Sequence, residues 1–195
     1  MEPLKEDDLV AFTNDITDRA FEFAEPKLAA EHKTLRHRLM VPKDTTHAVP
    51  LSYKPDGEDI RPDFLLLPIE AFTKDFKSVD QKYVNFIAAR MVGESKNRDV
   101  TAGTEQMQQY VRGLKRAQPW VHYALGMAVT KGKTVLMRGE CGGTERLELI
   151  LSDGHGCIEF IWILLGLAWR DHEGLGHNPS VELQGKEHLL LCRAA

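Results

Sequence analysis

The chain has 195 residues, 43% of them hydrophobic, and carries a formal net charge of −4 at pH 7. This length allows one domain with a sizeable apolar core, and we expect residues 1–195 to form a single domain. The acidic balance argues against a protein whose whole surface is basic for nonspecific DNA binding, although it leaves room for local basic patches.

Cysteine usage and the N-terminal residues bear on location. The three cysteines are an odd number without a Cys-x-x-Cys spacing, which fits a reducing compartment better than a disulfide framework. The N-terminal residues are acidic and lack the apolar core of a signal peptide. The strongly apolar stretch over residues 158–169 is shorter than the roughly 20 residues of a bilayer span. We therefore expect a cytoplasmic or nuclear protein that does not enter a membrane.

Residues 1–40 are expected to be helical. Apolar residues recur at three- and four-residue steps over residues 7–24, which predicts an amphipathic helix that ends at Pro26. A second helix is predicted over residues 27–40, followed by a loop over the proline- and threonine-rich residues 41–59. A local basic patch is expected from Lys33, Arg36, His37 and Arg38.

The first chemically informative residue is Asp63. It begins a short apolar run bounded by prolines, residues 63–68, which predicts a buried strand. An ionised carboxylate beside a core strand is costly unless it is paired or binds a cation. A metal ion and a buried arginine would both explain it, and so would a simple turn after Pro62.

A second strand is predicted over residues 86–96, with Glu94 and Lys96 near its end. Residues two apart on a strand share a face, so these side chains should project together, and the Ser95 carbonyl between them would add an oxygen ligand. If Asp63 meets them across a strand pair, two carboxylates converge beside one ammonium group. The ammonium group would then orient a water molecule or stabilise charge on a phosphate. An ordinary exposed ion pair is the alternative.

The third element is a helix predicted over residues 104–117. Gln106 and Tyr110 are four residues apart, so they lie on one face of that helix. The helix also carries basic residues that would reach a phosphate backbone if that face borders the site, namely Arg112, Lys115 and Arg116. A helix surface with one buried aromatic residue would give the same pattern.

The remaining segments complete the expected fold. Residues 69–84 must form a helix or an insertion between the two motif strands. Further along, the pattern predicts a hairpin, a third strand, a buried helix and a closing hairpin, at residues 121–130 with 133–139, 145–151, 158–169, and 181–183 with 188–192.

Taken in chain order, Asp63, Glu94-x-Lys96 and Gln106-x-x-x-Tyr110 resemble the motifs of the PD-(D/E)XK nuclease superfamily. The extra glutamine–tyrosine motif is that of its RecB-like branch. Each motif also has an ordinary structural explanation, and the hypothesis depends on their joint occurrence in this order.

The resemblance covers roughly residues 60–120 and implies an α/β fold in which a mixed central β-sheet is flanked by helices, the restriction-endonuclease-like core. It implies a Mg²⁺ or Mn²⁺ ion held by the two motif carboxylates and the Ser95 carbonyl, with the motif lysine as the catalytic lysine. An acidic residue of the first helix would complete the metal site. Glu22 is the first candidate and Glu31 the second.

A broader resemblance extends from Arg61 to the C-terminus. Residues 93–96, the glycine-rich turn at residues 138–143 and residues 175–179 are similar to the region that precedes the kinase lobe in fungal-type protein kinases. The chain itself has no three-glycine phosphate loop, His-Arg-Asp loop or Asp-Phe-Gly motif. The two resemblances are compatible if that leading region is itself a nuclease-like fold, active or decayed.

The sequence thus predicts a magnesium-dependent nuclease that hydrolyses phosphodiester bonds of nucleic acid, with DNA favoured over RNA. The alternative is a catalytically inactive nuclease-like module that binds protein or nucleic acid, and association as a homodimer or with a protein partner stays open. A zinc site is a further competitor, although its four candidate ligands match no compact zinc module: His155, Cys157, His172 and His177.

Overall fold

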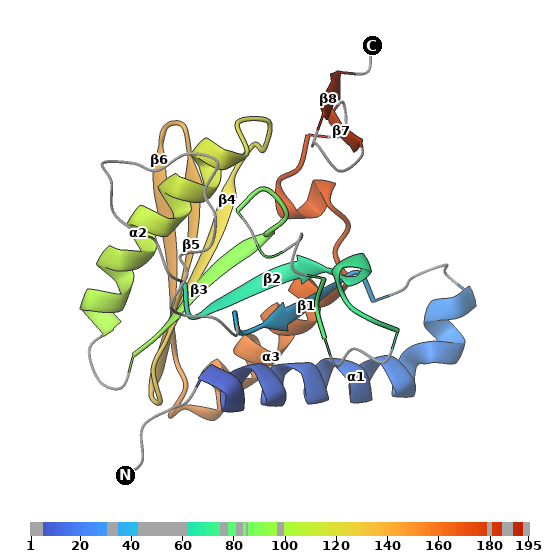
Figure 1. The fold of residues 1–195 in the computed structure, drawn as a ribbon. Coiled ribbons are helices and arrows are strands. Elements are labelled where there is room, and N and C mark those ends of the chain that lie inside the picture. The colour runs from blue at the N-terminus through green and yellow to red at the C-terminus, as the bar shows by residue number, and fades with distance from the viewer. Residues whose placement is uncertain are drawn as a thin grey trace.

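The computed structural model describes residues 6–30, 35–42, 62–74, 78–80, 84, 86–96, 100–178, 181–184 and 189–192. Its centre is a six-stranded mixed β-sheet of strand order β1-β2-β3-β4-β5-β6, with helices on both faces (Figure 1). The predicted α/β class, with a mixed sheet flanked by helices, is therefore confirmed. No helix in these ranges is long and apolar enough to cross a membrane.

In chain order the elements are α1 (Glu6–Ala30), β1 (His37–Met40), β2 (Phe64–Pro68), the 3-10 helix η1 (Ile69–Ala71), β3 (Met91–Ser95), α2 (Val100–Ala117), β4 (Ala124–Val129), β5 (Lys133–Glu140), β6 (Gly143–Ile150), α3 (Gly154–Trp169), the 3-10 helix η3 (Glu173–Leu175), β7 (Val181–Gln184) and β8 (Leu189–Cys192). Neighbouring strands run antiparallel except β3 and β4, which are parallel and are joined by α2. Strands β7 and β8 form a separate antiparallel pair.

Helix α2 packs on one face of the sheet, which we call the α2 face. Alternate strand residues such as Leu65 and Val92 point toward it and join Met107 and Val111 of the helix in one buried cluster. Gly126 of β4 lets the helix approach closely, because a Cβ atom there would lie 2.6 Å from the Met107 sulfur and from a Val111 methyl group. The position of α2 above β3 and β4 is therefore set by backbone contact as well as by apolar burial.

Helices α1 and α3 cover the opposite face, which we call the α1–α3 face. The intervening strand residues, Phe64, Leu66 and Met91, point this way and pack against Leu9 of α1 and Phe160 of α3 in a second buried cluster. Every residue of β2 is buried, because this strand lies between apolar layers on both sides.

The N-terminal expectations were only partly right. Helix α1 confirms the first predicted helix, but it continues through Pro26 to Ala30 instead of ending there. The second predicted helix, residues 27–40, is wrong because its C-terminal end forms strand β1. Pairing with β2, which buries Leu39 against the α1–α3 face, outweighs the local helical preference of these residues. Of the predicted loop over residues 41–59, only residues 41 and 42 are described.

Farther along, the predicted strands and hairpins are confirmed, with shifted ends. The strand expected over residues 86–96 begins only at Met91, after a turn, and η1 is the only helix in the described parts of residues 69–84. The apolar helix is α3, which starts earlier than expected and is not fully buried, because Ile158 and Trp162 have exposed fractions of 59% and 68%.

Gly93 provides a test of the β2–β3 pairing. It lies directly opposite Phe64, and a Cβ atom on Gly93 would lie 1.9 Å from a ring carbon of that fully buried side chain. We expect Gly93→Ala to lower the free energy of unfolding by about 1–3 kcal/mol or more, because the overpacked ring cannot move aside. Urea denaturation measures the change.

Gly132→Ala is the matched control, because nothing lies within 4 Å of the Cβ position at Gly132 in the β4–β5 turn. It should change stability by less than about 0.5 kcal/mol. Equal stability of the two variants would contradict the described contact between Phe64 and Gly93.

Candidate functional site

Asp63 lies just before β2, where it meets the C-terminal end of β3. Its backbone N–H donates to the Gly93 carbonyl at 2.9 Å, and its Oδ2 accepts from the Ser95 N–H at 2.7 Å. The N–H and C=O of one strand residue point to the same side, so the Ser95 carbonyl is also directed toward the side where Asp63 lies. The carboxylate of one strand thus reaches the main chain of its neighbour.

Glu94 lies on the α2 face, two residues beyond Val92. Its side chain is only 2% exposed, and one carboxylate oxygen, Oε1, accepts a short contact from the Lys96 ammonium group. The second oxygen, Oε2, is buried and has no hydrogen-bond partner within the described residues. A buried acceptor without a donor is costly in free energy, so binding of a cation or a proton at this oxygen would stabilise the protein.

Helix α2 covers this group with Gln106 and Tyr110. The Gln106 amide donates to the Tyr110 hydroxyl, and the tyrosine ring is buried in the core beneath α2. Burial raises the pKa of Tyr110, and the nearby Glu94 charge raises it further, so the hydroxyl stays protonated. The glutamine–tyrosine pair therefore faces the same carboxylate that Lys96 contacts.

The surroundings of the Glu94 carboxyl shift its pKa upward. Burial raises its pKa to about 7, the charge of Asp63 adds to this, and the Lys96 contact and the Tyr110 hydroxyl partly offset it. Near neutral pH the group is divided between its protonated and ionised forms. A cation bound there would take the place of the proton.

The five motif residues are thus brought together on the α2 face, but Glu22 is not. Glu22 is an exposed residue of α1, which lies across the sheet on the α1–α3 face, so it does not join this group and its predicted role as a ligand is not supported. Glu31 lies outside the described residues. Among the side chains that are described, no group of three histidine, cysteine or acidic residues could hold a metal ion, so a cation here would have two carboxylates and main-chain oxygen.

The predicted basic residues of α2 have different surroundings. Arg112 and Arg116 are exposed, whereas the Lys115 ammonium group donates to the carbonyls of Val121 and His122, the latter at 3.0 Å. Lys115 therefore fastens the connection between α2 and β4. Its predicted role in binding nucleic acid stays a prediction beside this structural one.

The basic patch expected at residues 33–38 does not form as predicted. His37 is fully buried, and Arg38 makes a two-pronged ion pair with Asp18 of α1 at 2.5 and 2.8 Å. Only Arg36 is exposed within the described part of this stretch, and Lys33 lies outside it.

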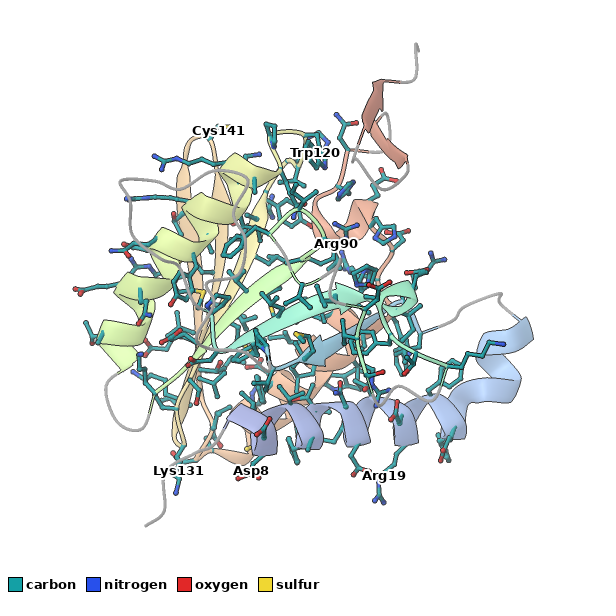
Figure 2. All side chains as sticks on the ribbon, viewed as in Figure 1. Asp8, Arg19, Arg90, Trp120, Lys131 and Cys141 are labelled. Carbon is teal, nitrogen blue, oxygen red and sulfur yellow. The ribbon has the colours of Figure 1, made fainter. Side chains whose placement is uncertain are left out.

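A second polar cluster, missed by the sequence reasoning, joins Arg90, Trp120 and three histidines, His37, His172 and His177 (Figure 2 labels Arg90 and Trp120). The Arg90 Nε donates to His172 Nδ1 at 3.3 Å, and the Trp120 indole donates to His177 Nε2 at 3.2 Å. These residues come from four separate parts of the chain. No spacing in the sequence relates them, so no local pattern could have revealed the cluster.

The three histidines of this cluster are neutral. Burial lowers the pKa of His37 to about 3 and that of His177 to about 3, and the Arg90 charge lowers both further. The pKa of His172 is lowered by the same two causes. Because His172 Nδ1 and His177 Nε2 accept hydrogen bonds, each of these rings carries its proton on the other nitrogen.

The competing zinc hypothesis is not supported. His155 and Cys157 lie in the first turn of α3, where His155 is 3.6 Å from Glu159 and the Cys157 thiol donates to the Leu151 carbonyl. His172 and His177 follow the other end of that helix and face Arg90, whose charge opposes a metal cation.

Comparison with known proteins finds no matching family model, no matching curated protein and no matching solved structure.

The buried carboxyl gives the first pH-dependent prediction. The pKa of Glu94 is raised from 4.5 to about 7 on folding, so its contribution to stability is present below pH 4.5 and is lost as the pH rises through 7. Glu94→Gln should therefore be more stable than the wild type at pH 8, by up to about 3 kcal/mol, and equally stable at pH 4. Urea denaturation across this range measures the difference.

Glu105→Gln, at an exposed position on the same helix as the glutamine–tyrosine pair, is the control and should give a difference of less than about 0.5 kcal/mol at every pH. A stability difference for Glu94→Gln that does not grow with pH would refute the buried, perturbed carboxyl.

The histidine cluster gives a prediction of the opposite sign. The pKa values of His37 and His177 are lowered from 6.5 to about 3, so an unfolded chain binds protons below pH 6.5 that the folded chain does not. Stability should fall by about 1.4 kcal/mol per pH unit for each ring as the pH drops below 6.5. Nitrogen-15 NMR should show both rings neutral at pH 5, with His177 protonated on Nδ1. A ring that titrates near 6.5 would contradict this.

Proposed function

We propose that this protein is a magnesium- or manganese-dependent nuclease of the PD-(D/E)XK type, which hydrolyses phosphodiester bonds of nucleic acid. The single observation that supports it most is the convergence of Asp63 and Glu94 from neighbouring strands, where one buried oxygen of Glu94 has no hydrogen-bond partner among the described residues. A buried carboxylate oxygen without a partner is costly, which favours a role in binding.

The donor set fits a hard divalent cation. Mg²⁺ prefers oxygen ligands, is often held by one or two carboxylates and keeps several of its own waters. Among the described residues, Asp63, Glu94 and the Ser95 carbonyl would hold it. The ion would supply a water molecule with a lowered pKa and neutralise charge on the phosphate.

The surroundings of Lys96 support a water-orienting or phosphate-binding role. Its ammonium group contacts the buried Glu94, yet its side chain is 32% exposed, so it also reaches the surface where a substrate would arrive. In this proposal the lysine holds the attacking water or the charge that develops on the phosphate.

Gln106 and Tyr110 of α2 lie over the carboxylate site and are joined by a hydrogen bond. The exposed Arg112 and Arg116 of the same helix would contact phosphates of the substrate. Contacts of this kind fix the register of a nucleic-acid strand without reading its sequence. DNA is favoured as the substrate over RNA, as the motif resemblance implies.

The test is cleavage of single- and double-stranded DNA and of RNA, with magnesium, with manganese and with a chelator. Asp63→Ala and Lys96→Ala should each reduce the rate by at least about 100-fold, because each removes a group that acts on the reacting atoms. Lys131→Ala, which removes an exposed lysine from the β4–β5 turn, should leave the rate unchanged. Cleavage that survives either site substitution would refute these roles.

Calorimetry with Mn²⁺ distinguishes the alternative, a catalytically inactive nuclease-like module that binds protein or nucleic acid. The nuclease should bind the ion, and Asp63→Ala should abolish that binding while the circular dichroism spectrum stays unchanged. A folded protein that takes up no metal would favour the inactive module, related to the region before fungal-type kinase domains.

A further inference from the structure

Strand β6 is an edge of the sheet, and no described strand other than β5 pairs with it. It is last in the strand order, and every residue from Gly143 to Glu148 is exposed. Its eight residues pair with β5 in unbroken register, with no bulge and no proline. In Figure 2 the labelled Lys131 and Cys141, which flank β5, mark the two ends of this long ribbon. An edge of this kind is a template for another strand.

The other edge of the sheet, β1, is covered. The Asn14 side chain of α1 receives the Leu39 N–H at 3.3 Å and donates to the Leu39 carbonyl at 3.0 Å, as a neighbouring strand would. The Arg36 N–H donates to the Ala168 carbonyl of α3 at 2.9 Å. Within the described part of the chain, two helices therefore protect one edge of the sheet, and no element pairs with the longer edge.

We propose that β6 pairs antiparallel with β6 of a second copy of this chain, about a two-fold axis at Leu147, and so joins two sheets into one. The axis places Arg146 of each copy opposite Glu148 of the other. This inference is independent of the proposed nuclease function, because it uses no residue of that site.

In β6, the main-chain groups that point away from β5 belong to the residues that this register pairs. The Leu151 N–H donates to the Gly132 carbonyl at 2.8 Å, so alternate residues back from it, including Leu147 and Leu149, bond to β5. The residues between them, including Arg146 and Glu148, direct their N–H and C=O groups away from β5. With the axis at Leu147, the main-chain N–H and C=O groups that point away from β5 in one copy face the same groups of the other copy. The two Arg146–Glu148 pairs then form four main-chain hydrogen bonds.

Charge selects this register over its neighbours. An axis at Arg146 would set two arginines directly opposite each other, and an axis at Glu148 would set two glutamates opposite each other, which destabilises a strand pair. The axis at Leu147 instead makes two arginine–glutamate pairs. Arg146 is exposed and makes no ion pair within the described residues, whereas Glu148 contacts Lys133 through Oε1 at 2.6 Å. The strand is therefore complementary to itself.

Leu147 supplies the apolar part of the contact. Its exposed fraction is 50%, and on the axis it would face Leu147 of the second copy in a non-hydrogen-bonded pair, where side chains approach most closely. One strand pair buries less surface than the roughly 1,200–2,000 Å² of a stable interface. We therefore expect a dimer that forms in the micromolar range of concentration.

Sedimentation velocity from micromolar to millimolar protein tests the proposal. The wild type should form a dimer, and Arg146→Glu and Glu148→Arg should each weaken it by at least about tenfold, because each sets like charges opposite each other. Glu145→Arg is the control, since that exposed residue lies opposite Leu149 in this register, and it should dimerise like the wild type.

Mixing the two charge variants gives the decisive result. Arg146→Glu and Glu148→Arg protein should form a heterodimer when mixed, because both pairs then again unite opposite charges, although neither variant dimerises well alone. All substituted positions are exposed, so folding should be retained, and thermal unfolding checks it. A wild type that stays monomeric at every concentration, or a mixture that gains no dimer, would overturn the proposal.

Amide exchange adds a readout of the register. As protein concentration rises, exchange of the Arg146 and Glu148 amides should slow, while that of Leu147 and Leu149, already bonded to β5, should not change. Slowing at Leu147 instead would overturn the assignment of the axis.

Discussion

The register between β2 and β3 is the constraint on which the candidate site depends. Phe64 stands opposite Gly93, and the next step along both strands brings Asp63 to the end of β3. Because side chains alternate between faces, a slip of one residue would turn Glu94 from the α2 face to the α1–α3 face. The aromatic ring seated on Gly93 prevents that slip, so a packing contact in the core determines where the acidic groups meet.

The two buried polar clusters solve the same problem differently. Around Glu94 one oxygen is left without a donor and the carboxyl has a raised pKa, so the folded state carries an unfavourable group. Around Arg90 the histidines are neutral because their pKa values are lowered, and His172 and His177 accept hydrogen bonds from Arg90 and Trp120. Both clusters leave buried polar atoms without a partner among the described residues, Glu94 Oε2 in the first and His37 Nδ1 and Arg90 Nη1 in the second. The second cluster also joins segments that are distant in the chain.

Much of the fold follows from local patterns, because β2, β4, β5 and α2 bury residues whose periodicity is visible in the sequence. Strand β1 could not be predicted, since its partner β2 lies far along the chain and the pairing outweighs local preference. For the site, the spacing of Glu94 and Lys96 and of Gln106 and Tyr110 correctly predicted which side chains share a face. The placement of Glu22 apart from this group could not be predicted, because no local signal shows which face of the sheet α1 covers.

The Asn14 side chain, which stands in for a missing strand beside β1, also limits how far the sheet can extend. A sheet with two open edges could recruit molecules without end and grow into a fibre. Here the Asn14 amide of α1 and the Ala168 carbonyl of α3 occupy the β1 edge, so a dimer formed through β6 would have β1, an occupied edge, at both ends of its joined sheet. Assembly would then stop at a dimer. The exposed β6 strand would therefore not cause the protein to form fibres at high concentration.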